Sequence, residues 1–148
     1  LGDVYKRQSY HNRICDEIEI KQIKQFAQNH GMKLATIGAS QKWISNMLVL
    51  NPFEVLYVFS KAKFVITDTF HGTIFASKYN GRFATLLRKS NNNKLSDLVK
   101  RLSIEEHVIS DFSELENAYG KASSKERVNK IIENERIRTI NYFKENLV

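Results

Sequence analysis

Short apolar runs alternate with amphipathic segments along most of the chain. Residues 64–66 and 83–87 are apolar, rich in β-branched or aromatic side chains and too short for helices, as is typical of strands buried on both faces of a parallel sheet. Residues 33–37 and 107–109 repeat this pattern, whereas residues 16–29 carry apolar side chains at helical spacing. The alternation predicts an α/β domain in which a mostly parallel sheet of about four strands lies between two layers of helices, a three-layer α/β/α arrangement.

Capping residues mark where the predicted helices begin and end. Asp16 precedes the first helix and Gly31 follows it. Asn51 and Pro52 open a second helix, because asparagine is a good cap and proline fits the first helical position. Gly81 is placed to end the third helix. We expect the second helix to face the sheet through Phe53, Leu56, Tyr57, Phe59 and Ser60.

The other segments divide into three further helices and one irregular stretch. Residues 94–102 have a helical apolar face, and residues 111–115 fit a short helix. Residues 123–147 predict one long charged helix with a sparse apolar stripe. In residues 38–49 the apolar side chains follow neither helical nor strand spacing, and we expect a helical turn or an irregular packed loop there.

The chain is expected to have three parts. Residues 1–8 look like a translated cloning scar or a disordered end and are excluded from the fold, with a short strand at Val4 and Tyr5 as the alternative. Residues 9–122 would form a Rossmann-like domain. Residues 123–148 would form a helix packed on this domain or on another part of a longer protein.

Polar residues follow two neighbouring predicted strands at the point where each strand ends. After residues 64–66 the chain turns through Asp68 and enters a helix that begins near His71. Residues 88–93 form a polar loop after the next strand. Ligands bind outside the carboxyl ends of strands in open α/β sheets, and the N–H groups of a helix start favour anions. The two loops therefore predict an anion-binding edge of the sheet.

Residues 67–73, with the sequence TDTFHGT, resemble the signature of the polysaccharide pyruvyl transferase family. The likeness continues upstream through residues 51–56 (NPFEVL) and downstream through residues 88–94 (RKSNNNK), and it covers about residues 18–109 with a weaker likeness in the tail. The resemblance implies an enzyme that transfers pyruvate from phosphoenolpyruvate to a sugar of a cell-surface or exopolysaccharide precursor. It also implies the carboxyl-terminal half of a two-domain, glycosyltransferase-B-like architecture, inactive without the amino-terminal half that supplies the acceptor side.

The resemblance points to His71 and Asp68 as the catalytic residues. An imidazole titrates near neutral pH, so His71 suits general acid or base chemistry, or donation to the phosphate. The alternative is a structural histidine bonded to a carbonyl. Asp68 would orient His71, or would instead cap the helix that follows.

Five further residues are expected to hold the substrate. Gly72 and Thr73 would supply N–H groups and a hydroxyl near the anion, with close packing of helix on strand as the alternative for Gly72. Arg88 would bind a carboxylate or phosphate with two hydrogen bonds, and Asn93 and Lys94 would complete the pocket. The alternative for these loop residues is simple solvation.

Composition narrows the class of protein only slightly. The 148 residues carry a net charge of +7, but the basic residues are dispersed and match no nucleic-acid-binding signature. Cys15 is the single cysteine, which excludes an internal disulfide and favours a packing role in a cytoplasmic protein. His11, His30 and His107 lack metal-site spacing, and we expect them at the surface or at helix ends, with no metal and no cofactor.

Neither a membrane span of about 18 apolar residues nor a signal peptide is evident. We expect a cytoplasmic protein. A peripheral position at the inner face of the membrane is the alternative, because the resemblance implies a glycan acceptor that can be lipid-linked there. Two rival functions fit the same pattern. The turn at residues 67–73 would hold the diphosphate of a nucleotide-sugar in a glycosyltransferase, and the basic charge would serve nucleic acid or membrane in a non-catalytic binding module.

Overall fold

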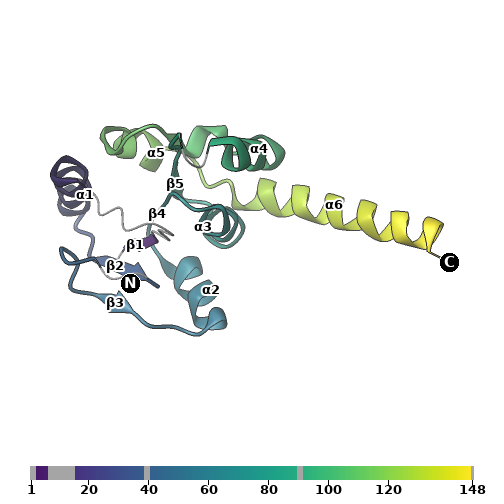
Figure 1. Cartoon of the computed structure of the whole chain (residues 1–148), viewed down its shortest axis with the longest axis horizontal. Helices are drawn as coiled ribbons and strands as arrows, with labels where there is room; N and C mark the ends of the chain where they lie inside the picture. The colour runs from purple at the N-terminus through teal and green to yellow at the C-terminus, as the bar shows by residue number, and fades with distance from the viewer. Residues whose placement is uncertain (1–2, 7–15, 39–40, 90–91, 148) are drawn as a thin grey trace.

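Six parallel strands form one sheet in the order β3-β2-β1-β4-β5-β6. The structure is a computed structural model that describes residues 3–6, 16–38, 41–89 and 92–147 (Figure 1). The strands are β1 (Asp3–Lys6), β2 (Leu34–Ile37), β3 (Met47–Leu48), β4 (Val65–Thr67), β5 (Phe83–Leu86) and β6 (Val108–Ile109). The expected α/β class and parallel sheet are confirmed, while the expected number of strands was too small.

The sheet is accompanied by helices that, apart from the unpredicted 3-10 turn at Glu105–His107, fall close to the predicted ranges. They are α1 (Glu17–Asn29), α2 (Pro52–Lys61), α3 (Phe70–Phe75), the π-helix η1 (Ala76–Asn80), α4 (Asn92–Leu102), the 3-10 turns η2 (Glu105–His107) and η3 (Phe112–Glu114), α5 (Leu115–Tyr119) and α6 (Lys125–Asn146). Gly81 ends η1 in the left-handed conformation, with φ at 79°.

The sequence interpretation missed two of the strands. β1 lies in the middle of the sheet and pairs with both β2 and β4, so excluding residues 3–6 from the fold was wrong and the alternative of a strand at Val4 and Tyr5 is confirmed. β3 adds an edge strand beside β2, in a segment expected to be a turn or loop. A strand of only two residues has too little alternation for a pattern to detect.

The two faces of the sheet bury different helices. Successive side chains of a strand point to opposite faces, so Val65 packs in one cluster with residues of α2, α4 and α6. Phe64 and Ile66 pack in the other cluster with Phe26 of α1 and Leu115 of α5. Burial of both faces explains why the strand pattern is continuously apolar rather than alternating.

Reciprocal caps begin α1 and α2 at the predicted residues. Asp16 accepts from the Glu19 N–H at 2.8 Å, while the Glu19 carboxylate accepts from the Asp16 N–H at 3.2 Å. Asn51 and Glu54 make the same exchange at the start of α2, with Pro52 at the first helical position. Side chains at the N-cap and third positions therefore satisfy N–H groups that have no partner inside either helix.

The inner face of α2 differs from the expected one. Val58 and Phe59 are buried, whereas Phe53 and Tyr57 are 83% and 59% exposed. Ser60 is also exposed, so Phe59 is the expected residue that does face the core. Phe53, Tyr57 and Ser60 are spaced four and three residues apart, which places all three on one side of the helix, the side away from the sheet.

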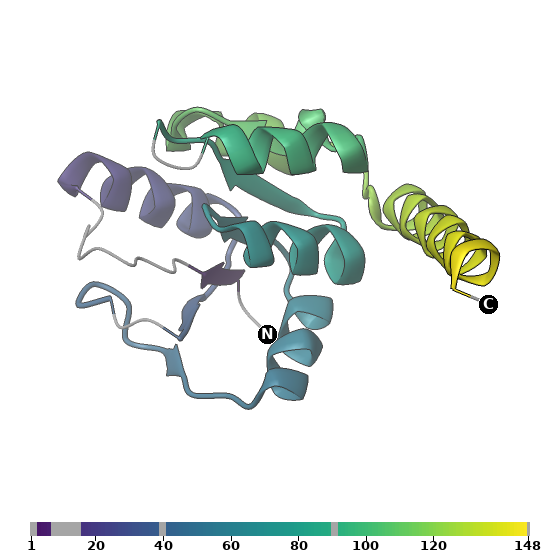
Figure 2. The same cartoon turned by 45° about the vertical axis from the view of Figure 1, so that its right-hand side comes forward.

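The long helix α6 is fixed to the domain by its first turns. The Ser124 N–H donates to the Gly81 carbonyl at 3.0 Å, the Asn129 side chain donates to the Lys78 carbonyl at 3.2 Å, and Val128 is buried. Beyond this base α6 extends away from the sheet (Figure 1; Figure 2). Within the described residues, α6 and the other helices are too short or too polar to span a bilayer.

His107 is the last residue of the 3-10 turn η2 and is buried in the core, so of the two predicted locations the helix end is confirmed and the surface is wrong. Its ring stacks on Phe83 with centroids 4.3 Å apart, and Nδ1 donates to the Phe83 carbonyl at 3.1 Å. Burial lowers the pKa of His107, and the nearby Glu106 carboxylate and Phe83 carbonyl offset this in part. His30 pairs with Glu116 at 2.7 Å near a helix end, as expected, and His11 lies outside the described residues.

Helix α3 starts in close contact with β4. A Cβ atom added at Gly72 would lie 2.1 Å from Thr67 Oγ1 and 2.6 Å from Thr69 Oγ1. Both threonines are β-branched and have few alternative rotamers, so they cannot easily make room. The close-packing alternative for Gly72 is therefore confirmed as a structural requirement at this position.

We predict that Gly72→Ala lowers the free energy of unfolding by about 2 kcal/mol, because the added methyl group overpacks the junction of β4 and α3. Gly120→Ala is the matched control, since its nearest neighbours would be 3.6 Å from the new Cβ, and we expect a change of at most about 0.5 kcal/mol. Urea denaturation measures both. Equal effects of the two substitutions would contradict the proposed clash.

We also predict that the protein loses stability as the pH falls through about 6.5, the ordinary pKa of histidine. The folded pKa of His107 is lower, so the unfolded chain takes up this proton first and is favoured by acid. His107→Asn keeps a donor for the Phe83 carbonyl and removes the titration. Unfolding free energies at pH 5.5 and 7.5 should differ less in this variant than in the wild type, and an unchanged difference would exclude His107 as the cause.

Candidate functional site

The two predicted polar loops meet at one edge of the sheet. β4 and β5 pair in parallel, with Thr67 opposite Thr85, so the two strands end within one residue of each other. Asp68 follows β4 and Arg88 lies two residues beyond β5. Their side chains form an ion pair, with Asp68 Oδ2 3.5 Å from Arg88 Nε. The expectation that these loops converge is confirmed.

A third charged side chain joins this pair from α1. Glu19 Oε1 lies 2.9 Å from Arg88 Nη2, which makes this the shorter of the two ion pairs. The side chains of Arg88, Glu19 and Asp68 are only 15%, 18% and 13% exposed, so water screens them less than surface charges. We call these three residues the arginine–carboxylate cluster. It holds one positive and two negative charges.

Glu19 was not among the predicted site residues. Its sequence context, three residues after Asp16 at a helix start, indicates a capping box and explains one of its carboxylate oxygens. Contact with Arg88 depends on where α1 lies relative to the end of β5, about 70 residues further along the chain. No local pattern carries that information.

Asp68 does not cap the helix that follows it. Thr69 is the cap of α3, and its Oγ1 accepts from the Gly72 N–H at 3.0 Å. The capping alternative for Asp68 was therefore wrong, and its carboxylate is instead directed to Arg88. The orientation of His71 by Asp68 stays a prediction.

His71 is exposed on the first turn of α3. Its ring centroid lies 5.9 Å from that of Phe70 and 6.4 Å from that of Phe75. The imidazole is therefore accessible from solvent at the carboxyl edge of the sheet, beside aromatic rings. Such a position allows contact with a ligand bound at this edge.

Gly72 and Thr73 already use their backbone donors within the helix start. The Thr73 N–H donates to the Thr69 carbonyl at 3.0 Å, as the Gly72 N–H does to Thr69 Oγ1. The buried Thr73 hydroxyl donates to the Thr69 carbonyl at 2.9 Å and lies 3.1 Å from Thr85 Oγ1. These contacts join α3 to β5, and a ligand could reach these groups only by replacing them.

Asn93 and Lys94 lie on the first turn of α4, and both are exposed. The ion pairs found within the described ranges do not connect them to the arginine–carboxylate cluster. Their role in substrate binding stays a prediction.

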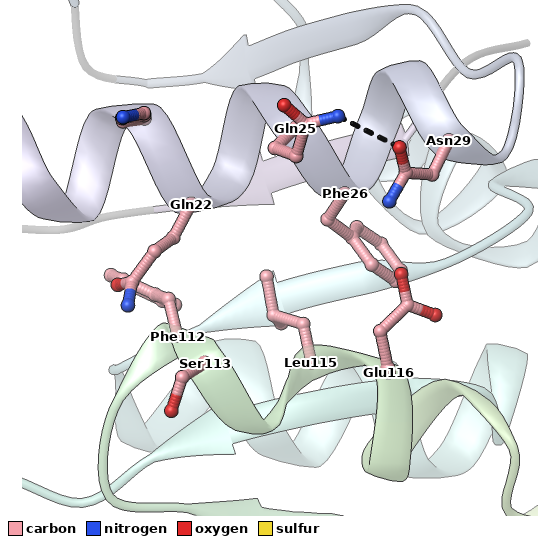
Figure 3. A pocket seen from close by; sticks show the side chains of 9 residues that line it. Gln22, Gln25, Phe26, Asn29, Phe112, Ser113, Leu115 and Glu116 are labelled. Atoms are coloured by element: carbon pink, nitrogen blue, oxygen red, sulfur yellow. Dashed lines mark hydrogen bonds between the residues drawn. The ribbon is translucent and has the colours of Figure 1, made fainter.

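A separate groove runs along α1, one turn beyond Glu19. It encloses about 270 Å³ between α1 and the η3–α5 segment. Gln22 and Phe26 point from α1 toward that segment, while Gln25 donates to Asn29 along the helix (Figure 3). The groove is lined by Lys21, Gln22, Gln25, Phe26, Asn29, Phe112, Ser113, Leu115 and Glu116. None of the predicted site residues contributes to it, so it is distinct from the cluster at the sheet edge.

Metal-binding side chains do not gather in the part of the chain that the structure describes. A search of residues 3–6, 16–38, 41–89 and 92–147 found no group of three or more histidine, cysteine, aspartate or glutamate side chains placed to hold an ion.

Comparison with known proteins identifies the family of the chain. The model of the family described as polysaccharide pyruvyl transferase matches residues 3–90, more than half of the sequence. The match starts earlier than the resemblance noted from the motifs and ends before Asn93 and Lys94, but it includes Asp68, His71 and Arg88. A comparison with curated proteins found no match. On the evidence of the family model, the chain belongs to the polysaccharide pyruvyl transferase family.

Proposed function

We propose that this chain carries the donor side of an enzyme that transfers pyruvate from phosphoenolpyruvate to a sugar of a cell-surface or exopolysaccharide precursor. The family is one of transferases, which supports an enzymatic role at a coarse level. The observation that carries the finer proposal is the presence of Arg88 and an accessible His71 at one sheet edge, within the family-matched stretch. Phosphoenolpyruvate is the donor substrate, and no cofactor is required.

The reaction makes four demands on the protein. The carboxylate and phosphate of phosphoenolpyruvate must be held, and its C3 must receive a proton. Two hydroxyl oxygens of the sugar must bond to C2, and each loses its proton, while the bond from C2 to the phosphate oxygen breaks. Pyruvate is left on the sugar as a ketal, and phosphate leaves with one of the protons. Guanidinium groups suit the anions, and an imidazole suits the proton transfers.

The residues at the sheet edge divide these tasks. Arg88 holds an anionic group of the donor, and Asn93 and Lys94 approach it from the start of α4. His71 is the general acid or base, or donates to the phosphate, with Asp68 in a supporting role. Gly72 and Thr73 follow His71 in the same turn. Their N–H groups donate to the ligand only where it replaces their contacts with Thr69.

The architecture and location form part of the same proposal. The domain is a three-layer, Rossmann-like unit and the carboxyl-terminal half of a glycosyltransferase-B-like enzyme, whose other half supplies the acceptor side. The acceptor is a glycan, lipid-linked at the inner face of the membrane, and the enzyme works in the cytoplasm. The parallel sheet and the family match support this picture.

We predict that phosphoenolpyruvate causes saturable amide NMR shifts at Gly72, Thr73 and the loop around Arg88, and that His71→Ala weakens this response at least about tenfold. The reason is the loss of an imidazole that contacts the bound donor. His30→Asn is the control, because His30 pairs with Glu116 at the other end of α1. An undiminished response of His71→Ala would exclude His71 from donor binding.

The same titration separates the rival function. Shifts with a nucleoside diphosphate, and none with phosphoenolpyruvate, would replace the proposal with a nucleotide-sugar glycosyltransferase. A response to neither ligand would contradict the assignment of a donor site to this chain.

We predict that Arg88→Lys lowers the affinity for phosphoenolpyruvate about tenfold, because lysine keeps the charge but not the planar fork that binds an anion with two hydrogen bonds. Lys89→Ala, at the adjacent exposed position, should change it at most about twofold, as expected of a screened surface charge. Isothermal titration calorimetry measures both. A larger loss of affinity in Lys89→Ala than in Arg88→Lys would contradict this and indicate that the anion binds at the exposed surface of the loop.

A further inference from the structure

Glu19 already pairs with the guanidinium group that the proposed function assigns to an anionic substrate. Its Oε1 lies 2.9 Å from Arg88 Nη2, at the distance of a charge-assisted hydrogen bond, and both side chains are mostly shielded from water. Building on the proposed donor site, we infer that Glu19 is an internal counter-ion of Arg88 that the carboxylate or phosphate of the substrate displaces. Glu19 thereby sets the affinity of the site for anions.

The geometry distinguishes Glu19 from Asp68 as the carboxylate that moves. Asp68 has a short side chain and follows β4 directly, so its carboxylate stays close to the sheet edge. Glu19 belongs to a different element, α1, and its longer side chain has one more rotatable bond. The change from an Arg88-bound to a released Glu19 therefore needs a rotamer change and no movement of the backbone.

Release of Glu19 also costs little free energy at its other carboxylate oxygen. Oε2 accepts from the Asp16 N–H at 3.2 Å, and this bond is exposed to solvent. Water can replace the carboxylate there, so the N–H group is not left without an acceptor. The Glu19 N–H donates to Asp16 Oδ1 at 2.8 Å, and this bond does not involve the moving carboxylate, so it continues to cap the helix.

The net charge of the cluster explains why replacing Glu19 with the substrate affects anion binding. With both carboxylates in place the cluster carries a net negative charge, which opposes the approach of an anion. When the substrate takes the place of Glu19, the guanidinium keeps two anionic partners and the cluster loses one internal negative charge. The exchange therefore contributes less binding free energy for an anion with a single weak charge than for phosphoenolpyruvate, which has a carboxylate and a phosphate.

The test is Glu19→Gln with Glu17→Gln as the matched control. Glutamine at the third helical position retains the capping box, so α1 should keep its start. Glu17 lies in the same first turn and is exposed, so its substitution makes the same change in net charge and in the helix-end electrostatics. Calorimetric titration of the full chain with phosphoenolpyruvate and, separately, with inorganic phosphate measures the affinity.

We expect Glu19→Gln to bind phosphoenolpyruvate about fivefold more tightly than the wild type, and Glu17→Gln to stay within about twofold, because a partly shielded competing carboxylate is removed only in the first. Equal or weaker binding by Glu19→Gln would overturn the inference, and weaker binding would make Glu19 a residue that positions Arg88. Tighter binding of phosphate by Glu19→Gln, without any binding of phosphoenolpyruvate, would keep the counter-ion role and reject the proposed donor. Binding of neither anion by any variant would reject both.

Discussion

The parallel pairing of β4 with β5 is the constraint on which most of this structure depends. It places Thr67 opposite Thr85 and so brings the chain segments after both strands to one level. The ion pair of Asp68 with Arg88 forms because of this register. A shift of one residue would also turn the side chains of β4 to the opposite faces and exchange their partners in the two hydrophobic clusters.

The turn after β4 shows how packing and the candidate chemistry share the same residues. Thr69 caps α3, Gly72 lets the helix approach the strand, and Thr73 joins the helix to β5 through Thr85. These contacts attach the backbone beneath His71 to the sheet edge. The imidazole itself remains exposed, so the packing uses the residues around His71 and leaves its ring available.

Local signals predicted the fold better than they predicted the site. The caps Asp16 and Asn51 and the apolar runs that became β4 and β5 each depend on a few neighbouring residues, and each was found. β3 was missed because two residues have no measurable period. The burial of His107 and the contact of Glu19 with Arg88 both depend on segments distant in sequence, so no local pattern contains them.

Helix α6 has a consequence for the dynamics of the protein. In the described part of the chain, the contacts that join its 22 residues to the domain lie in its first turns, where Val128 is buried and Ser124 donates to Gly81. Toward the other end the side chains are exposed, so the helix there is stabilised mainly by its own backbone hydrogen bonds. Amide hydrogen exchange along α6 should therefore form a gradient, slowest at the base and faster in each successive turn, so that one helix contains both some of the most protected and some of the least protected amides of the chain.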